Sequence, residues 1–188
     1  MTKDFVLKAL NSGEYISFDD FKKIDSELWT DRDVVMAAIK VNGYAVQFAS
    51  DDLRNDADIM REAVKNKPNA FMYIGNKLRK DRDFILEMAK DYSIVLCEID
   101  EKLQKDREIV LEAVKKDSLA LEFASEELQN DAEIVLEAVK YSGYAIRYAS
   151  ERLRDNEEIV RESVKEDPAL IHFASDRIKK MPGILSWN

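Results

Sequence analysis

The chain has 188 residues, of which 46% are apolar and 36% are charged, and its formal net charge is −9. This composition predicts one soluble domain with no membrane partner, because no run of 18 apolar residues occurs and Asp4 interrupts the apolar stretch that a secretory signal would need. The acidity disfavours non-specific binding to nucleic acid. The single cysteine, Cys97, favours a reducing compartment, so we expect a cytoplasmic protein, although a translocated bacterial effector would have the same composition.

Residues 1–30 resemble an incomplete copy of a pattern that repeats later in the chain. Residues 5–10 (FVLKAL) match its apolar positions and residues 26–28 (SEL) match its end, with four additional residues between Tyr15 and Asp20. We expect this segment to form an N-terminal capping unit, because the ends of repeat arrays depart from the consensus.

From residue 31 a 25-residue pattern occurs six times without an insertion. Counting the first residue of each copy as position 1, position 3 is always acidic and Lys occupies position 10. Apolar residues occupy positions 4, 5, 8 and 9, except for Ser163 at position 8 of the sixth copy. Position 1 is Asp31, Asp56, Asp81, Asp106, Asp131 and Asn156. A short polar side chain followed by this spacing predicts a capped amphipathic helix in each copy.

The second half of each copy predicts a short second helix. Position 13 is Gly, Pro or Ser, which ends the first helix, and apolar residues then occupy positions 14, 15, 16, 18 and 19. Ser at position 20 in four copies predicts a cap for one last turn that carries the Leu or Ile of position 23 inward. We therefore expect residues 31–180 to form six two-helix units of an all-α solenoid, a right-handed superhelix stabilised by burial between neighbouring units.

The last residues, 181–188, do not begin a seventh copy. We expect them to form a C-terminal cap in which Ile184, Leu185 and Trp187 cover the last face of the array. The whole of residues 1–188 is then one repeat domain.

Residues 106–115 (DREIVLEAVK) and 123–128 (FASEEL) resemble the tandem helical-repeat family catalogued as domain of unknown function 4116, over residues 31–180. The resemblance implies a helical-repeat fold and no catalytic activity. The third copy departs most, because Glu98 occupies a position that is Phe or Tyr elsewhere. We interpret it as an unusual core residue whose carboxylate must find a donor or reach water, with a kink or an exposed edge near residues 92–100.

No combination of residues predicts catalysis, a metal site or a cofactor. The Asp-x-Asp pairs recur at helix starts, so capping explains them better than cation binding, and a calcium loop would need further ligands. Cys97 and His172 are three copies apart, about 25–30 Å if helices pack 8–10 Å apart, which is too far for a nucleophile and its base. We therefore predict that the chain is not an enzyme, and a carboxylate-based enzyme is the least favoured alternative.

Position 17 varies freely between constrained positions, which is typical of a solvent-facing row, and nearby tyrosines suit a protein interface. This candidate interaction row is Tyr44, Gln47, Met72, Tyr92, Cys97, Glu122, Tyr141, Tyr144, Arg147 and His172. An ordinary exposed face is the alternative. The leading hypothesis is a protein–protein interaction scaffold whose partner carries a basic patch, with a monomer as the default state.

A basic segment raises nucleic-acid binding as the second hypothesis. Its residues are Lys65, Lys67, Lys77, Arg79, Lys80 and Arg82. They would contact phosphates while the tyrosines stack on bases.

Overall fold

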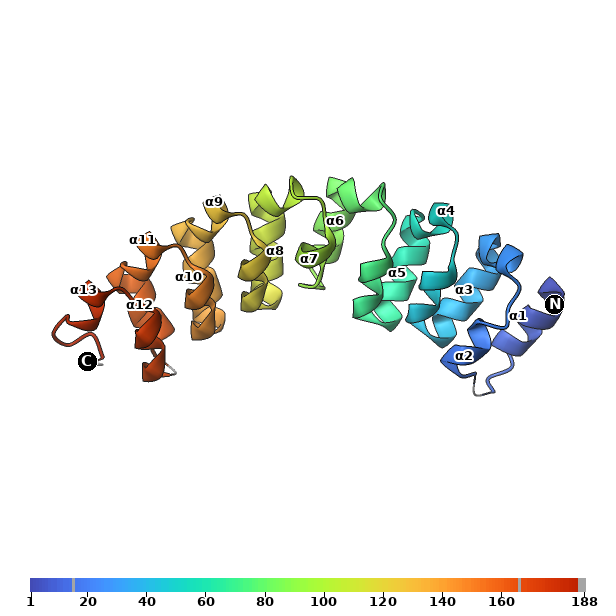
Figure 1. Ribbon diagram of the computed structural model, residues 1–188, viewed down its shortest axis with the longest axis horizontal. Coiled ribbons are helices and arrows are strands. Elements are labelled where there is room, and N and C mark those ends of the chain that lie inside the picture. Colours follow the sequence, from blue (N-terminus) through green and yellow to red (C-terminus); the bar gives the residue numbers. More distant parts are fainter. Residues whose placement is uncertain (15, 166, 186–188) are drawn as a thin grey trace. The chain divides into compact units, whose positions relative to one another are not determined.

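The computed structural model describes residues 1–14, 16–165 and 167–185, and the regular elements in these ranges are all helices (Figure 1). The chain divides into two compact units, Met1–Ile85 (unit 1) and Leu86–Asn188 (unit 2), and the division falls within α6 (Arg82–Ala89). Across the described ranges, no helix has the length and apolar character needed to cross a membrane. The predicted all-α helical repeat is confirmed.

The helices of unit 1 that precede α6 are α1 (Lys3–Leu10), α2 (Phe18–Phe21), η1 (Ser26–Thr30), α3 (Arg32–Val41), η2 (Gly43–Phe48), α4 (Asp51–Arg54), α5 (Ala57–Asn66), η3 (Pro68–Tyr73) and η4 (Leu78–Lys80), where η denotes a 3₁₀ helix. Those of unit 2 that follow α6 are α7 (Val95–Glu98), η5 (Leu103–Lys105), α8 (Arg107–Lys116), η6 (Ser118–Phe123), α9 (Glu126–Gln129), α10 (Ala132–Tyr141), η7 (Gly143–Tyr148), α11 (Glu151–Arg154), α12 (Glu157–Ser163), η8 (Pro168–Phe173) and α13 (Asp176–Lys179).

A regular repeat contains three elements. In the fourth repeat these are α8, which spans positions 2–11, η6, which spans positions 13–18, and α9, which spans positions 21–24. The predicted second helix is thus a 3₁₀ helix, and the Ser-x-x-Leu step after it is a separate α-helical turn. The third repeat differs, because α6 has eight residues instead of ten and the short α7 replaces the 3₁₀ helix. The predicted departure near residues 92–100 therefore takes the form of a different helix type.

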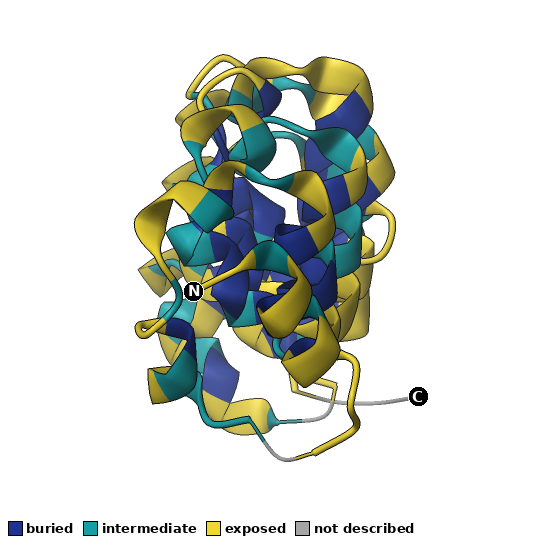
Figure 2. Cartoon of the chain, turned by 90° about the vertical axis from the view of Figure 1, so that its right-hand side faces the viewer, coloured by how far each residue is buried: buried dark blue, intermediate teal, exposed yellow. Residues whose placement is uncertain are grey.

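Equivalent helices stack on one another within each unit. In unit 1, α3 contacts both α1 and α5, and η2 contacts η3; in unit 2, α10 contacts both α8 and α12, and η7 contacts both η6 and η8. The side chains buried between the layers come from positions 4, 5, 8 and 9 of the α-helices and from positions 15, 16 and 19. Figure 2 shows these buried segments facing inward, with the exposed segments outside. The right-handed superhelix stays a prediction.

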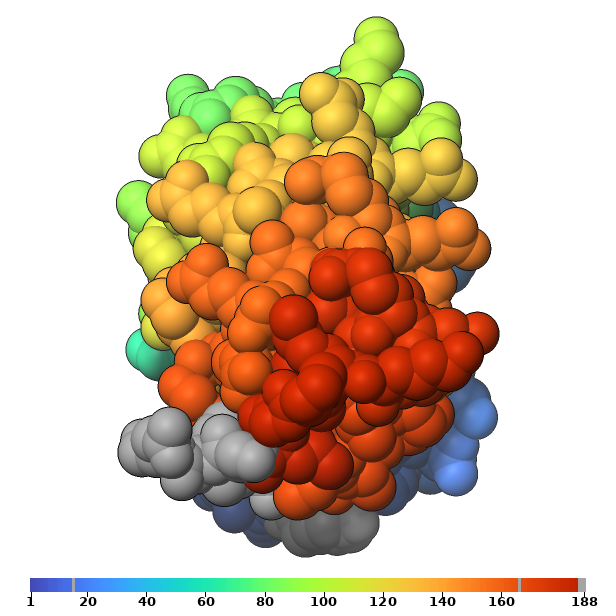
Figure 3. All heavy atoms as spheres, turned by 90° about the vertical axis from the view of Figure 1, so that its left-hand side faces the viewer, coloured from blue at the N-terminus to red at the C-terminus, as the bar shows by residue number. Residues whose placement is uncertain are grey.

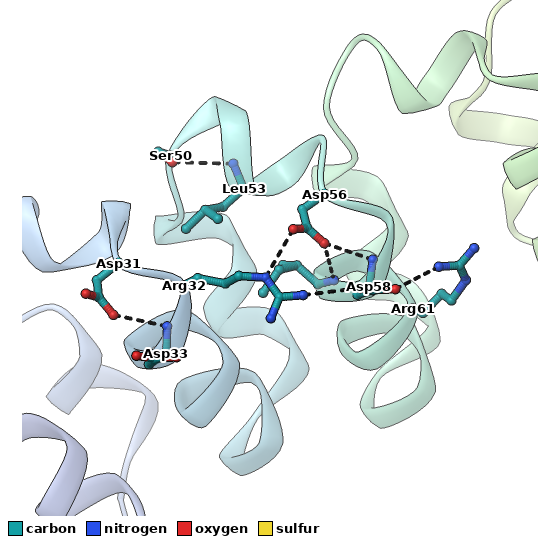
Figure 4. A network of polar contacts seen from close by, with 9 residues as sticks. Asp31, Arg32, Asp33, Ser50, Leu53, Asp56, Asp58 and Arg61 are labelled. Carbon is teal, nitrogen blue, oxygen red and sulfur yellow. Dashed lines mark hydrogen bonds and ion pairs between the residues drawn. The ribbon is translucent and has the colours of Figure 1, made fainter.

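Each long helix begins where its position-1 side chain accepts backbone hydrogen bonds. Asp56 Oδ1 accepts from the N–H groups of Asp58 (2.9 Å) and Ile59 (3.1 Å), as Figure 4 shows. The same two bonds occur at Asp31, Asp81, Asp106 and Asp131, whereas Asn156 accepts only from the N–H of Ile159. These bonds satisfy first-turn amides that have no partner inside the helix. The capping interpretation of the Asp-x-Asp pairs is confirmed.

A backbone hydrogen bond joins successive repeats at position 20. Its N–H donates to the position-24 carbonyl of the preceding repeat, from Ser150 to Gln129 (2.9 Å) and from Ser175 to Arg154 (3.0 Å) in unit 2. The serine hydroxyl also accepts from the position-23 N–H, as Ser150 Oγ does from Leu153 (3.3 Å), which confirms the predicted cap. One residue therefore fixes the spacing between repeats and starts the final turn.

The second repeat achieves the same turn with a different residue. Gly75 replaces the serine, and Asn55 of the preceding repeat supplies the acceptor, its Oδ1 lying 2.7 Å from Lys77 N and 3.3 Å from Leu78 N. A Cβ atom at Gly75 would lie 2.3 Å from Asn55 Cγ. A serine here would displace the asparagine side chain from its present position.

The C-terminal end of unit 2, seen in Figure 3, is covered by the segment after α13. Ile184 is buried there, and Arg161 Nη1 donates to the carbonyl oxygens of Gly183 (3.0 Å) and Ile184 (3.3 Å). Leu185 is exposed, so it does not cover the last face as expected. Trp187 lies outside the described residues.

We predict that Gly43→Ala destabilises the protein, because a Cβ atom at Gly43 would lie 2.3 Å from the backbone oxygen of Ala63 in the next repeat. Overpacking of this kind costs about 1–3 kcal/mol. Urea denaturation followed by circular dichroism measures the change. The exposed Asn69→Ala serves as the control and should change the free energy of unfolding by less than about 0.5 kcal/mol. Equal stability of the two variants would contradict the close approach.

Candidate interaction surface

The 3₁₀ helices of unit 2 expose one side of each turn. A 3₁₀ helix has three residues per turn, so positions 14 and 17 lie above one another, with position 18 beside them, while positions 15, 16 and 19 face the core. The exposed fractions of Tyr144, Leu119 and Phe123 are 51%, 42% and 41%. We call this surface the outer 3₁₀ face; it consists of Leu119, Glu122, Phe123, Tyr144, Arg147, Tyr148, Ala169, His172 and Phe173.

Side-chain contacts join the contributions of adjacent repeats into one continuous surface. Tyr148 Oη donates to Glu122 Oε2 (2.8 Å), and Tyr144 Oη donates to Asp167 Oδ2 (3.2 Å). The Arg147 guanidinium lies 4.9 Å from the centroid of the Tyr148 ring, a cation–π distance. The hydrogen bond to Glu122, reinforced by burial, raises the pKa of Tyr148.

His172 and Cys97 do not form a catalytic pair. The His172 ring stacks on Phe173 with 3.8 Å between centroids, and its Nδ1 lies 2.6 Å from the carbonyl oxygen of Ala169. Cys97 lies on α7, and η6 and η7 lie between α7 and the His172 helix in the stack. Its Sγ donates to Ile94 O (3.0 Å), and burial, followed by the charge of Glu98, raises the pKa of the thiol. Such a thiol is a poor nucleophile.

The candidate interaction row is only partly exposed. Met72, Glu122, Tyr141, Tyr144, Arg147 and His172 are exposed, whereas Tyr44, Gln47, Tyr92 and Cys97 are half-buried. Most of the exposed members belong to unit 2. Sequence reasoning missed Leu119, Phe123, Tyr148 and Phe173 as parts of this surface. The signal that could have found them is the three-residue spacing of positions 14 and 17, which places both on one side of a 3₁₀ helix but not directly above one another in a helix of 3.6 residues per turn.

The interpretation of Glu98 as a core residue is wrong. Its position in the repeat, position 18, is half-buried at Phe48 and Tyr148 and exposed at Phe123. Glu98 is itself half-buried on α7, like the aromatic residues at this position in the first and fifth repeats, so it does not belong to the buried core.

The predicted basic segment does not form one patch. Lys65 lies in the last turn of α5 and Lys67 directly follows this helix, whereas Lys77 donates its N–H to Asn55, just before the first turn of α5. Ten residues at 1.5 Å each make α5 about 15 Å long. Arg79, Lys80 and Arg82 follow Lys77 along the chain, so the six residues divide into two groups at opposite ends of this helix.

The capping carboxylates also pair with cations of the preceding repeat. Arg32 contacts Asp56 and Asp58, each at 3.2 Å (Figure 4), and Arg107 contacts Asp131 (3.0 Å) and Glu133. The cap oxygens therefore already have amide and guanidinium partners. Among the residues that the structure describes, no group of three or more His, Cys, Asp and Glu side chains could hold a metal ion.

The environment of Asp131 favours its ionised form. Partial burial opposes ionisation, but hydrogen bonds from the Ile134 N–H and from Arg107 outweigh it and lower the pKa of the carboxyl below 3.8. A lowered pKa stabilises the folded state above pH 3.8, and this contribution is lost as the pH falls through the folded-state pKa.

We predict that Asp131→Ala lowers the free energy of unfolding at pH 7 by about 1 kcal/mol, because the cap is lost. Asp131→Asn should lose only a few tenths of a kcal/mol, since asparagine caps the helix at Asn156, and this deficit should shrink at pH 3. Urea denaturation at both pH values measures the differences. The exposed Asp52→Asn is the control. An asparagine variant as unstable as the alanine variant at pH 7 would show that the ion pair, and not the cap, stabilises this helix.

These features define an all-α helical-repeat protein whose successive repeats are coupled through ion pairs and backbone hydrogen bonds. The chain belongs to the family described as Domain of unknown function (DUF4116), whose model matches residues 2–54, 31–79, 56–104, 81–129, 106–154 and 131–179. Each match covers two consecutive copies of the pattern, in agreement with the dependence of each copy on its neighbour. No match was found among curated proteins or among solved structures.

Proposed function

We propose that the chain is a non-enzymatic, cytoplasmic protein-recognition module that binds a protein partner through the outer 3₁₀ face. The supporting observation is that the repeats of unit 2 bury apolar side chains at the same positions, yet expose Tyr144, Leu119 and Phe123 to solvent on one connected surface. Contiguous apolar surface with aromatic side chains is typical of the centre of a protein interface.

The charge of unit 2 favours a basic partner. Residues 86–188 contain 15 Lys and Arg against 23 Asp and Glu, a net charge of −8, whereas residues 1–85 have a net charge of −1. Glu122 lies within the outer 3₁₀ face, and Asp117 and Asp167 cap the 3₁₀ helices that carry it. An acidic surface around an apolar centre attracts a protein segment that combines Lys or Arg with apolar side chains.

Nucleic-acid binding is less well supported. The basic residues of unit 1 divide between the two ends of α5, and the exposed aromatic side chains of unit 2 lie on the more acidic unit. Binding to single strands requires a basic groove that follows the backbone, with stacking aromatics along it.

We predict that the double variant Leu119→Ala/Tyr144→Ala loses the partner. Proteins captured from the native host by cross-linking to the full chain should be recovered at least about tenfold less with this variant, since truncating an interface hot spot costs about 2 kcal/mol or more. Both side chains are exposed, so the unfolding midpoint should not change. Recovery with the wild-type chain should also fall as salt is raised.

Tyr141→Ala is the matched control, because it removes an exposed tyrosine from α10 and leaves the outer 3₁₀ face intact. If the wild-type chain and the double variant recover equal amounts of protein, the outer 3₁₀ face is not the binding surface. If only nucleic acid is captured, the chain does not act by protein recognition.

A further inference from the structure

The first helix has the same register as the long helices of the regular repeats. Lys3 Nζ contacts Asp31 and Asp33, each at 2.8 Å, as Arg32 contacts the equivalent two acids of the following repeat. Lys3 is therefore a position-2 residue. It follows that Phe5 and Ala9 occupy positions 4 and 8 of the pattern.

Positions 4 and 8 are exposed in α1 although they are buried everywhere else. In the six regular repeats the exposed fraction at these positions is at most 5%. In α1, Phe5 is 63% exposed and Ala9 is also exposed, whereas Val6 and Leu10, at positions 5 and 9, are buried. The outer side of α1, at the N-terminal end that faces the viewer in Figure 2, thus has the chemistry of a helix face that normally contacts another helix.

A groove lies beside this face in unit 1. It has a volume of about 280 Å³, and its lining includes Phe5, Ala9, Ile16 and Ile24. The Asp20–Lys23 ion pair (2.7 Å) lies at its edge, and this pair, with hydrogen bonds from Ser17, lowers the pKa of Asp20 to about 2. The groove is apolar with charged groups at its border, as in a protein interface.

The sizes and charges along α1 are complementary to a second copy of the same helix in the opposite direction. In an antiparallel pair related by a two-fold axis, Phe5 of each copy packs against Ala9 of the other, a large side chain against a small one. The same pairing places Asp4 of one copy beside Lys8 of the other. Both are exposed, and neither forms an ion pair or a side-chain hydrogen bond within the described chain.

We propose that the outer face of α1 is a homodimer interface in which two copies of the chain pair their first helices antiparallel. A head-to-tail alternative is disfavoured, because the last repeat of unit 2 is covered by Ile184 and by the contacts of Arg161. The pairing surface is one side of an eight-residue helix and the groove beside it, so we expect a weak dimer that dissociates at concentrations on the order of micromolar. This proposal does not depend on the proposed function, which concerns unit 2.

Sedimentation velocity of the full chain between about 1 and 200 μM tests the proposal, because this range brackets micromolar dissociation. The wild-type chain should shift from monomer to dimer across this range, and Phe5→Asp should remain monomeric. Asp4→Lys or Lys8→Asp alone should weaken the dimer at least about tenfold, because each places like charges together. The combined variant Asp4→Lys/Lys8→Asp should recover the dimer, and an equimolar mixture of the two single variants should form heterodimers.

Each result decides the proposal. If the wild-type chain is monomeric at every concentration, the proposal is overturned. It is overturned in the same way if the chain is monomeric because another protein, or a preceding segment of a longer chain, covers this face. A dimer that survives Phe5→Asp, or single variants that weaken the dimer without recovery in the combined variant, overturns the antiparallel geometry. The charge variants change only exposed residues, so they decide the question if Phe5→Asp perturbs the fold.

Discussion

The structure depends on the fact that no single repeat can bury its own apolar side chains. Positions 4 and 8 are covered only when another helix lies against them, as the contrast between the exposed Phe5 and the buried Val34 shows. The backbone hydrogen bond from position 20 to position 24 of the preceding repeat then fixes how one repeat sits on the next within each unit. Burial between neighbouring repeats supplies the stability, while this bond and the ion pairs at the helix starts supply the register.

Most of the fold could be predicted from the sequence because its determinants are local. An N-cap such as Asp106 and the apolar spacing after it specify a helix within ten residues, and Ser125 specifies its turn in the same way. The helix type of the following segment could not be predicted. Six residues are too few to separate a period of 3.0 from one of 3.6, so an aromatic residue at position 18 was assigned to the core. The error at Glu98 has the same origin.

The candidate site was less predictable because it depends on distances between repeats. Lys65 and Lys77 are near in sequence but lie at opposite ends of α5, whereas Glu122 and Tyr148 are 26 residues apart and hydrogen-bonded. The free variation at position 17 correctly indicated solvent exposure in Glu122, Arg147 and His172, but not in Gln47 or Cys97. Likewise, the replacement of a serine by Gly75 makes sense only when Asn55 is seen beside it.

The bond between positions 20 and 24 uses only main-chain atoms, so it tolerates any residue that has a backbone N–H. It does not tolerate a change in the number of residues between one bond and the next. One residue added inside a repeat would move the donor away from its acceptor and rotate every later apolar face out of the core. Length can therefore change at low cost only by gain or loss of complete 25-residue modules. The four extra residues of the chain lie before residue 31, outside the six regular repeats.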